Sequence, residues 1–129
     1  MQTESLLQEW YWKNRVLLLF APRRESIPYQ QQVAALDGNR AGLAERDVIV
    51  LEAVGDRAIP FGGGLGETLE TARLRDSFNI APDEFQVVLI GEDGTEKLRS
   101  AEPIATDRLF QIMDAMPTRQ RETQGERKE

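Results

Sequence analysis

The chain has 129 residues, neither cysteine nor histidine, and a formal net charge of −6 from 16 basic and 22 acidic side chains. This length predicts one domain, and the lack of thiol and imidazole groups excludes thiol redox chemistry, histidine acid–base catalysis and most transition-metal sites. The acidic balance argues against nucleic-acid binding, and no apolar run approaches the roughly 20 residues that span a bilayer.

The N-terminal part of the chain predicts a helix and then a central strand. Residues 3–12 carry apolar side chains at the spacing of a short amphipathic helix, and the aromatic run at residues 10–12 (WYW) indicates packing over a sheet. Residues 16–20 (VLLLF) are all apolar, which is typical of a strand covered on both faces. Pro22 ends that strand.

A helix and a second strand follow. Ser26 and Pro28 are typical of a helix start, and Asp37-Gly38 ends or bends this helix. Residues 48–51 (VIVL) form another apolar run and predict a second buried strand. Two such strands around a helix imply a parallel pair joined by a right-handed crossover.

A glycine-rich loop at residues 55–66 precedes a helix predicted at residues 67–78. Within and just after the loop, residues 62–68 (GGGLGET) resemble a phosphate-binding loop. Glu67 stands where such a loop needs a lysine, however, and a carboxylate at that point repels phosphate. We therefore interpret the glycines as a flexible connection.

The C-terminal part predicts a hairpin and a last helix. Residues 85–90 are a third apolar strand, and Asp93-Gly94 is the strongest hairpin turn signal in the chain. Residues 95–99 return as a polar edge strand. Residues 107–116 have helical apolar spacing, with Thr106 as the predicted N-cap.

This order of elements predicts an α/β fold, a thioredoxin-like three-layer sandwich. We expect a four-stranded mixed sheet of order 2-1-3-4 with helices on both faces. The prediction places a single domain over residues 1–116 and a disordered polar tail over residues 117–129.

Two segments carry a resemblance to a known family. They are Trp12-Lys13-Asn14-Arg15 followed by residues 17–22 (LLLFAP), and residues 88–91 (VLIG) followed by Asp93-Gly94 and Lys97-Leu98-Arg99. Over residues 6–116 the chain resembles the DUF4174 domain family, whose animal relatives are coiled-coil-domain-containing and sushi-repeat matrix proteins. The resemblance implies a thioredoxin- or peroxiredoxin-like fold and carries over no catalytic residue.

The chain departs from a working thioredoxin at both parts of the redox site. The redox cysteines of that fold follow its first strand, where this chain has residues 22–26 (PRRES). A cis-proline opens its third strand, where this chain has residues 84–86 (EFQ). Because thiolate chemistry needs sulfur, thiol oxidoreductase and peroxidase activity is excluded.

The same turn after the first strand is the candidate ligand site. Open α/β sheets bind ligands at the carboxyl ends of their strands, and Arg23, Arg24 and Ser26 lie there, before a helix. Two guanidinium groups beside a helix N-terminus favour a small anion, held weakly because Glu25 partly cancels their charge. The alternative is a solvated turn without a ligand.

Other charged groups predict no further site. The carboxylate pairs Asp83-Glu84 and Glu92-Asp93 flank the third strand at opposite ends and lack the spacing of a calcium loop, so we interpret them as solvated surface. We expect no metal, no cofactor and no catalytic residue.

Two functions remain open at this point. The favoured one is a non-catalytic module that binds a protein partner or another copy of the chain. The alternative is a small-anion or metabolite binder, or a non-redox enzyme, that uses Arg23, Arg24 and Ser26. The N-terminal sequence lacks the pattern of a signal peptide and predicts a cytoplasmic protein, or a secreted or periplasmic one if a signal peptide has been removed.

Overall fold

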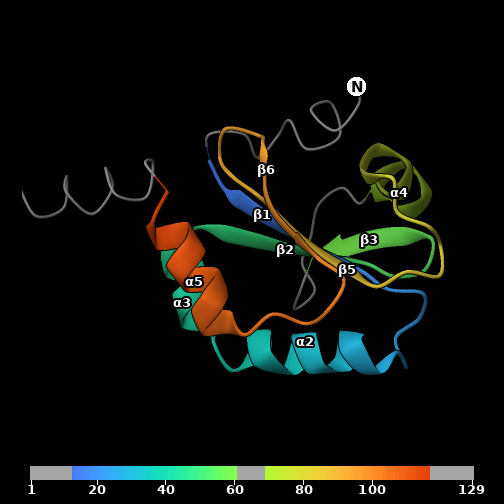
Figure 1. Ribbon diagram of the computed structural model, residues 1–129, viewed down its shortest axis with the longest axis horizontal. Coiled ribbons are helices and arrows are strands. Elements are labelled where there is room, and N and C mark those ends of the chain that lie inside the picture. The colour runs from blue at the N-terminus through green and yellow to red at the C-terminus, as the bar shows by residue number, and fades with distance from the viewer. Residues whose placement is uncertain (1–12, 61–68, 117–129) are drawn as a thin grey trace, which may run out of the picture.

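The computed structural model describes residues 13–60 and 69–116. In chain order the elements are β1 (Arg15–Phe20), α2 (Ile27–Asp37), α3 (Arg40–Glu45), β2 (Val48–Ala53), β3 (Arg57–Pro60), β4 (Leu69–Glu70), α4 (Thr71–Phe78), β5 (Gln86–Ile90), β6 (Glu96–Ser100) and α5 (Thr106–Asp114). The sheet is a middle layer, with α2, α3 and α5 on one face and α4 on the other (Figure 1). The predicted helix at 3–12 with its aromatic run, the glycines of 62–66 and the polar tail lie outside the described residues.

The sheet has the predicted centre but extends further at one edge. Its order is β4-β3-β2-β1-β5-β6, with β1 parallel to β2 and antiparallel to β5. The order β2-β1-β5-β6 confirms the predicted sequence of four strands. The expectation of only four strands was wrong, because β3 and the two-residue β4 add to the β2 edge.

The extra strands follow from a tight reversal after β2. Gly55 has a φ of 82°, a conformation that glycine adopts without steric cost, and the chain turns back there to pair β3 antiparallel with β2. The helix predicted at residues 67–78 begins only at Thr71, since Leu69–Glu70 forms β4. Short strands within a glycine-rich stretch show no clear periodicity, which is why the sequence indicated a loop.

The apolar run of β1 is the centre of two cores. All six residues of β1 are buried, and successive side chains alternate between the two faces. Leu17 and Leu19 pack with α2, α3 and α5, whereas Leu18 and Phe20 pack with α4. Both cores therefore depend on the same strand.

The helix and hairpin boundaries agree with the sequence in most places. α2 ends at Asp37 with Gly38 as its C-cap, and Gly94 forms the predicted hairpin turn with a φ of 84°. The N-cap of α5 is Ala105 rather than Thr106. Thr106 lies inside the helix, where its hydroxyl donates to the carbonyl oxygen of Ala35 at 3.1 Å, so this side chain joins α5 to α2 instead of capping.

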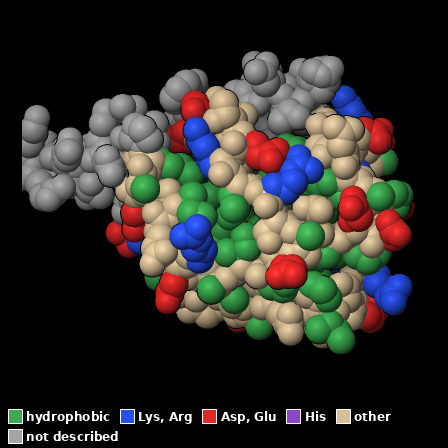
Figure 2. All heavy atoms as spheres, viewed as in Figure 1, with side chains coloured by type: hydrophobic (Ala, Val, Ile, Leu, Met, Phe, Trp, Pro, Cys, Tyr) green, Lys and Arg blue, Asp and Glu red, His purple; other side chains and the backbone are tan. Residues whose placement is uncertain are grey.

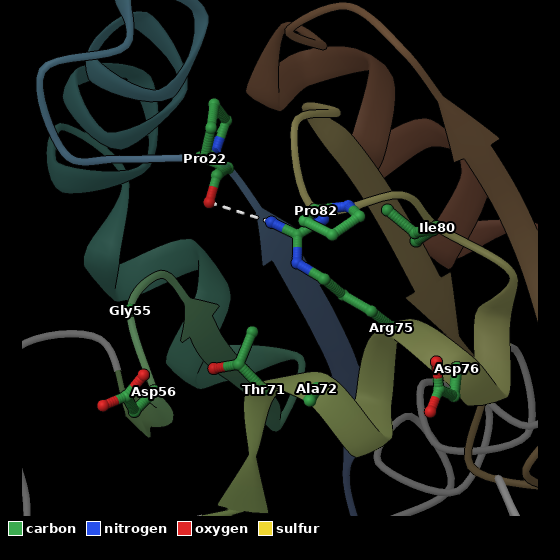
Figure 3. A pocket seen from close by; sticks show the side chains of 10 residues that line it. Pro22, Gly55, Asp56, Thr71, Ala72, Arg75, Asp76, Ile80 and Pro82 are labelled. Carbon is green, nitrogen blue, oxygen red and sulfur yellow. Dashed lines mark hydrogen bonds between the residues drawn. The ribbon is translucent and has the colours of Figure 1, made fainter.

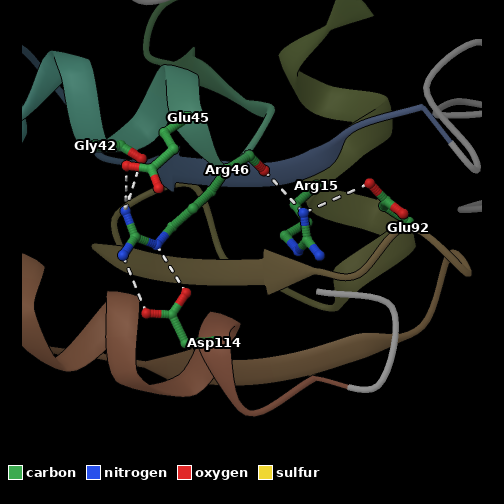
Figure 4. A network of polar contacts seen from close by, with 6 residues as sticks. All are labelled: Arg15, Gly42, Glu45, Arg46, Glu92 and Asp114. Atoms are coloured by element: carbon green, nitrogen blue, oxygen red, sulfur yellow. Dashed lines mark hydrogen bonds and ion pairs between the residues drawn. The ribbon is translucent and has the colours of Figure 1, made fainter. Parts of the chain in front are cut away.

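A glycine allows close contact between α3 and α5. A Cβ atom at Gly42 would lie 2.6 Å from the ring of Phe110. On the same ring, the guanidinium of Arg46 lies 4.0 Å from the centroid, and it donates to both carboxylate oxygens of Asp114 at 2.9 and 3.0 Å (Figure 4). Arg46 thus joins the two helices above the glycine.

We expect Gly42→Ala to lower the free energy of unfolding by about 1–3 kcal/mol, because the added methyl group displaces Phe110. Gly38→Ala is the matched control: its Cβ would contact only atoms at 3.8 Å, at an ordinary negative φ. Urea denaturation of both variants measures the difference. Equal stability of the two variants would show that Phe110 does not pack on Gly42.

Candidate functional site

The turn after β1 lies where the sequence predicted a site, at the carboxyl ends of β1 and β2. The backbone N–H of Ser26 donates to the carbonyl of Arg23 at 3.2 Å and closes the turn. Ser26 is the N-cap of α2, as predicted, but its side chain makes no capping hydrogen bond. Arg23 is exposed to solvent. The structure therefore brings the three predicted residues to one turn.

Arg24 is engaged within the protein rather than directed to an open site. Its Nη1 lies 3.1 Å from Oε1 of Glu52 and donates to the hydroxyl of Tyr29 at 2.6 Å. The Tyr29 hydroxyl in turn donates to Oε1 of Glu52. This Arg24–Tyr29–Glu52 cluster joins the turn, α2 and β2, and its one positive and one negative charge cancel.

The cluster also makes Tyr29 a poor proton donor. Burial, the hydrogen bond to Glu52 and the negative charge of Glu52 raise the pKa of Tyr29 to about 12, against a smaller lowering by Arg24. At neutral pH the phenol is therefore protonated, and neither a phenolate nor an uncompensated cation is available in the cluster.

We expect an absorbance titration at 295 nm to show one tyrosine that ionises near pH 12 and that is missing in Tyr29→Phe. The chain has a second tyrosine, so the difference between wild type and variant identifies the group. Because the folded-state pKa lies above the ordinary value of 10, stability from this group is complete below pH 10 and falls as the pH rises toward 12. Ionisation of Tyr29 near pH 10 would contradict the cluster.

A pocket of about 380 Å³ lies beside the same turn, on the side of the sheet that α4 covers (Figure 3). The turn after β1, the turn between β2 and β3, one face of α4 and the segment before β5 form its wall. The lining residues are Ala21, Pro22, Gly55, Asp56, Thr71, Ala72, Arg75, Asp76, Ile80 and Pro82.

Among the described residues of this pocket wall, Arg75 is the one basic side chain. It is 7% exposed, and its guanidinium donates to three backbone carbonyl groups: Ala21 at 2.9 Å, Ala81 at 2.5 Å and Glu84 at 3.4 Å. The guanidinium also lies 5.5 Å from the ring centroid of Phe20. Desolvation by burial lowers the pKa of Arg75, and the charges of Glu84 and Asp83 act in the opposite direction.

Thr71 supplies a second polar group in the wall of the pocket. It is 5% exposed, and its hydroxyl oxygen has no hydrogen-bond partner. Thr71 and Arg75 are four residues apart in α4, so both side chains lie on one face of the helix. A cation, an unpartnered hydroxyl and the first turn of a helix therefore meet at one wall.

The arrangement offers binding groups and few reactive ones. Among the described residues that line the pocket there is no thiol, imidazole or amine; they contribute one hydroxyl, that of Thr71, and two carboxylates, those of Asp56 and Asp76. Within residues 13–60 and 69–116, no group of three acidic side chains is placed to hold a metal ion. Figure 2 shows acidic and basic side chains interspersed over one face of the described chain. The geometry suits recognition of a ligand.

The sequence analysis did not identify Arg75 and Thr71 as pocket residues, and it did not identify Glu52 as the carboxylate that pairs with Arg24. Glu52 continues the alternation of Val48 and Val50 in β2 and thus faces the α2 side of the sheet, and this pattern could have indicated a buried carboxylate. Arg75 and Thr71 carry no comparable signal, because α4 is short and polar. Their burial depends on the turns that pack against the helix.

One carboxylate interpretation was wrong. Glu92 was predicted to be solvated surface, but it is 8% exposed and lies 3.5 Å from Nη1 of Arg15, which is fully buried (Figure 4). Arg15 also donates to the carbonyl of Arg46 at 2.8 Å. A buried arginine at the start of β1 requires a nearby negative group, and Glu92 follows the neighbouring strand.

Residues 6–122 match the family described as "Domain of unknown function (DUF4174)". The chain is 29% identical to coiled-coil domain-containing protein 80 of Danio rerio over 92% of its own length, and 26% identical to sushi repeat-containing protein SRPX2 of Xenopus laevis over 85%. It spans 16% and 25% of the length of these two relatives.

Two solved structures share the fold. A reduced 2-Cys peroxiredoxin of Plasmodium vivax superposes with a TM-score of 0.64 and 21% identity, covering 89% of this chain and 84% of the other. Thioredoxin peroxidase I of Plasmodium yoelii gives a TM-score of 0.63 and 19% identity, covering 89% and 79%. The fold is therefore thioredoxin-like, as predicted. None of the helices in the described residues is long and apolar enough to cross a membrane.

Proposed function

This chain belongs to the DUF4174 family, and we propose that it is a non-catalytic binding module whose ligands bind at the carboxyl end of β1. The observation that carries the proposal is the pocket at that end, whose described lining offers the cation of Arg75 and the hydroxyl of Thr71 for binding and no thiol or imidazole for catalysis. The chain contains no cysteine, so the thiol chemistry of a peroxiredoxin has no reacting atom here.

A protein partner is the favoured ligand. Ile27 begins α2 directly after the turn and is 67% exposed, so it offers apolar surface to a partner at this end of the sheet. A partner that covers Ile27 would lie next to the turn of Arg23 and Arg24. Either a different protein or a second copy of this chain is compatible with this surface.

A small anion is the second candidate ligand. The engagement of Arg24 with Glu52 and Tyr29 counts against the turn alone as the anion site. Arg75, at the same end of β1 but on the other side of the sheet, favours the pocket instead. If a small anion binds in this pocket, Arg23 and Ser26 lie in the neighbouring turn and are not among the residues that line the site.

The absence of catalysis is tested with insulin reduction and hydrogen peroxide consumption, each with dithiothreitol as reductant. We expect rates equal to the protein-free blank, because no residue can form the required sulfur intermediate. A rate that rises in proportion to protein concentration would contradict the non-catalytic part of the proposal.

The binding part is tested by amide chemical shifts of the ¹⁵N-labelled chain, with benzoate and a small acidic peptide as probes, and by light scattering for self-association. We expect perturbed amides at the turn after β1 and the start of α4, or a dimer that Ile27→Ser dissociates. If no probe perturbs this end and the chain remains monomeric at millimolar concentration, the proposed binding end is wrong.

A further inference from the structure

The pocket beside β1 contains a buried cation whose hydrogen bonds all go to backbone carbonyls, while the negative charges of Glu84 and Asp83 act on it from beyond ion-pair distance. Arg75 forms no ion pair with any carboxylate of the described residues; its acceptors are the three carbonyls of Ala21, Ala81 and Glu84. Buried charges in proteins are normally paired, because an isolated one is costly to desolvate. Three of the five guanidinium N–H groups are used in these bonds, which leaves two for a ligand.

We propose that this pocket binds a carboxylate group, contributed by a small organic acid or by an acidic side chain of a protein, with Arg75 and the first turn of α4 as its recognition groups. The inference rests on the proposed function and deepens it by naming the chemistry of the ligand. A planar carboxylate matches the fork of a guanidinium, because it can accept two parallel N–H···O hydrogen bonds.

Thr71 provides an independent indication of a ligand. Its hydroxyl is buried without a partner, which is rare in native proteins and costs free energy unless a partner is supplied. Rotation about χ1 can move the hydroxyl into the position that the methyl group occupies, and threonine uses more than one χ1 rotamer in helices. A bound carboxylate can therefore accept a hydrogen bond from Thr71.

The start of α4 adds a favourable field for an anion. Thr71 and Ala72 are the first residues of this eight-residue helix, and both line the pocket. The first turn of a helix has N–H groups without intrahelical acceptors and carries partial positive charge. Figure 3 shows the Arg75 side chain reaching from the same helix toward the turn of Pro22, across the space above Thr71 and Ala72.

The rest of the wall restricts which acids fit. Pro22, Ile80 and Pro82 are apolar and suit a hydrocarbon group. Asp56 and Asp76 are exposed carboxylates of the wall, and they repel a ligand with more than one negative charge. A monocarboxylate with an apolar body should therefore bind better than sulfate or phosphate.

The test is a calorimetric and NMR titration with benzoate and with its neutral isostere benzamide. Wild type is expected to bind benzoate at least about tenfold more tightly than benzamide, as a charge-assisted hydrogen bond predicts. A second pair of probes, the blocked peptides Gly-Glu-Gly and Gly-Gln-Gly, distinguishes the source. Tighter binding of the Glu peptide than of benzoate assigns the carboxylate to a protein, and the reverse assigns it to a small acid.

Three variants locate the binding groups. Arg75→Gln should weaken benzoate binding about tenfold or more, whereas Arg73→Gln, on the same helix but exposed and outside the pocket wall, should leave it within twofold. Thr71→Val should weaken binding several-fold without lowering the urea midpoint, because it removes a hydroxyl that has no partner in the free protein. If Arg75→Gln does not fold, the test of the carboxylate site is the loss of benzoate affinity in Thr71→Val together with the preference of wild type for benzoate over benzamide.

Failure of this inference is distinguishable from failure of the proposed function. If benzoate perturbs amides at the carboxyl end of β1 but binds no better than benzamide, or binds Arg75→Gln and Thr71→Val as it binds wild type, the carboxylate site is wrong and the binding end stands. If neither acid nor peptide perturbs that end, the carboxylate site is wrong, and the proposed function is wrong as well if the chain also remains monomeric at millimolar concentration.

Discussion

Glu92→Ala is expected to lower the free energy of unfolding by about 3–5 kcal/mol, because it removes a buried carboxylate that lies 3.5 Å from the fully buried guanidinium of Arg15. Arg15 is fully buried at the start of the central strand, so water cannot replace the lost partner. The hydrogen bond from Arg15 to the carbonyl of Arg46 is unaffected by the substitution, so the expected loss reports the missing carboxylate of Glu92.

Two further variants separate the charge effect from simple truncation. Glu102→Ala removes an exposed carboxylate and should change stability by less than about 0.5 kcal/mol. The double variant Arg15→Met/Glu92→Met should recover most of the loss, because buried ion pairs are often replaceable by apolar groups. Guanidinium chloride unfolding measures all four proteins. A single-variant loss no larger than that of Glu102→Ala would show that the pair is solvated.

Leu18→Ala should lower the free energy of unfolding by about 2–5 kcal/mol, because it removes buried apolar atoms and leaves a cavity in the core. Leu18 is fully buried in β1 and stands between Leu51 of β2 and Val88 of β5. Because β1 is the middle strand of the sheet, the surrounding side chains have little room to collapse into the space.

Leu98→Ala is the comparison for this substitution. Leu98 lies on the edge strand β6 and is only partly buried, so its loss should cost clearly less than that of Leu18. Thermal and urea unfolding of both variants gives the comparison. A loss below about 1 kcal/mol for Leu18→Ala would mean that β1 is not the centre of the sheet.

The central part of this fold could be predicted because its signals are local and strong. The five apolar residues at 16–20 have no exposed face in the structure, and Asp93-Gly94 forms the expected turn between β5 and β6. The β2 edge could not be predicted in the same way. β3 has four residues and β4 has two, so each depends on pairing with its neighbour more than on its own sequence.

The position of the turn after β1 could be predicted from the sequence, but the partners of the charged side chains near it could not. The carboxyl end of β1 follows from the β-α-β order alone, and the turn of Arg23, Arg24 and Ser26 does lie there. The partner of Arg24 is Glu52, 28 positions away, and the cation of the pocket is Arg75, which lies on another helix. Such pairings are set by tertiary packing, which adjacent residues in a sequence do not reveal.

A crystal structure with 4-bromobenzoate tests the account most directly, because the anomalous signal of bromine locates the ligand independently of the protein map. The expected result is one bromine peak in the pocket, with the carboxylate oxygens within about 3 Å of the Arg75 guanidinium and near the start of α4. A peak at the turn of Arg23 and Arg24 instead, or no ordered ligand in the pocket at a saturating concentration, would contradict the account.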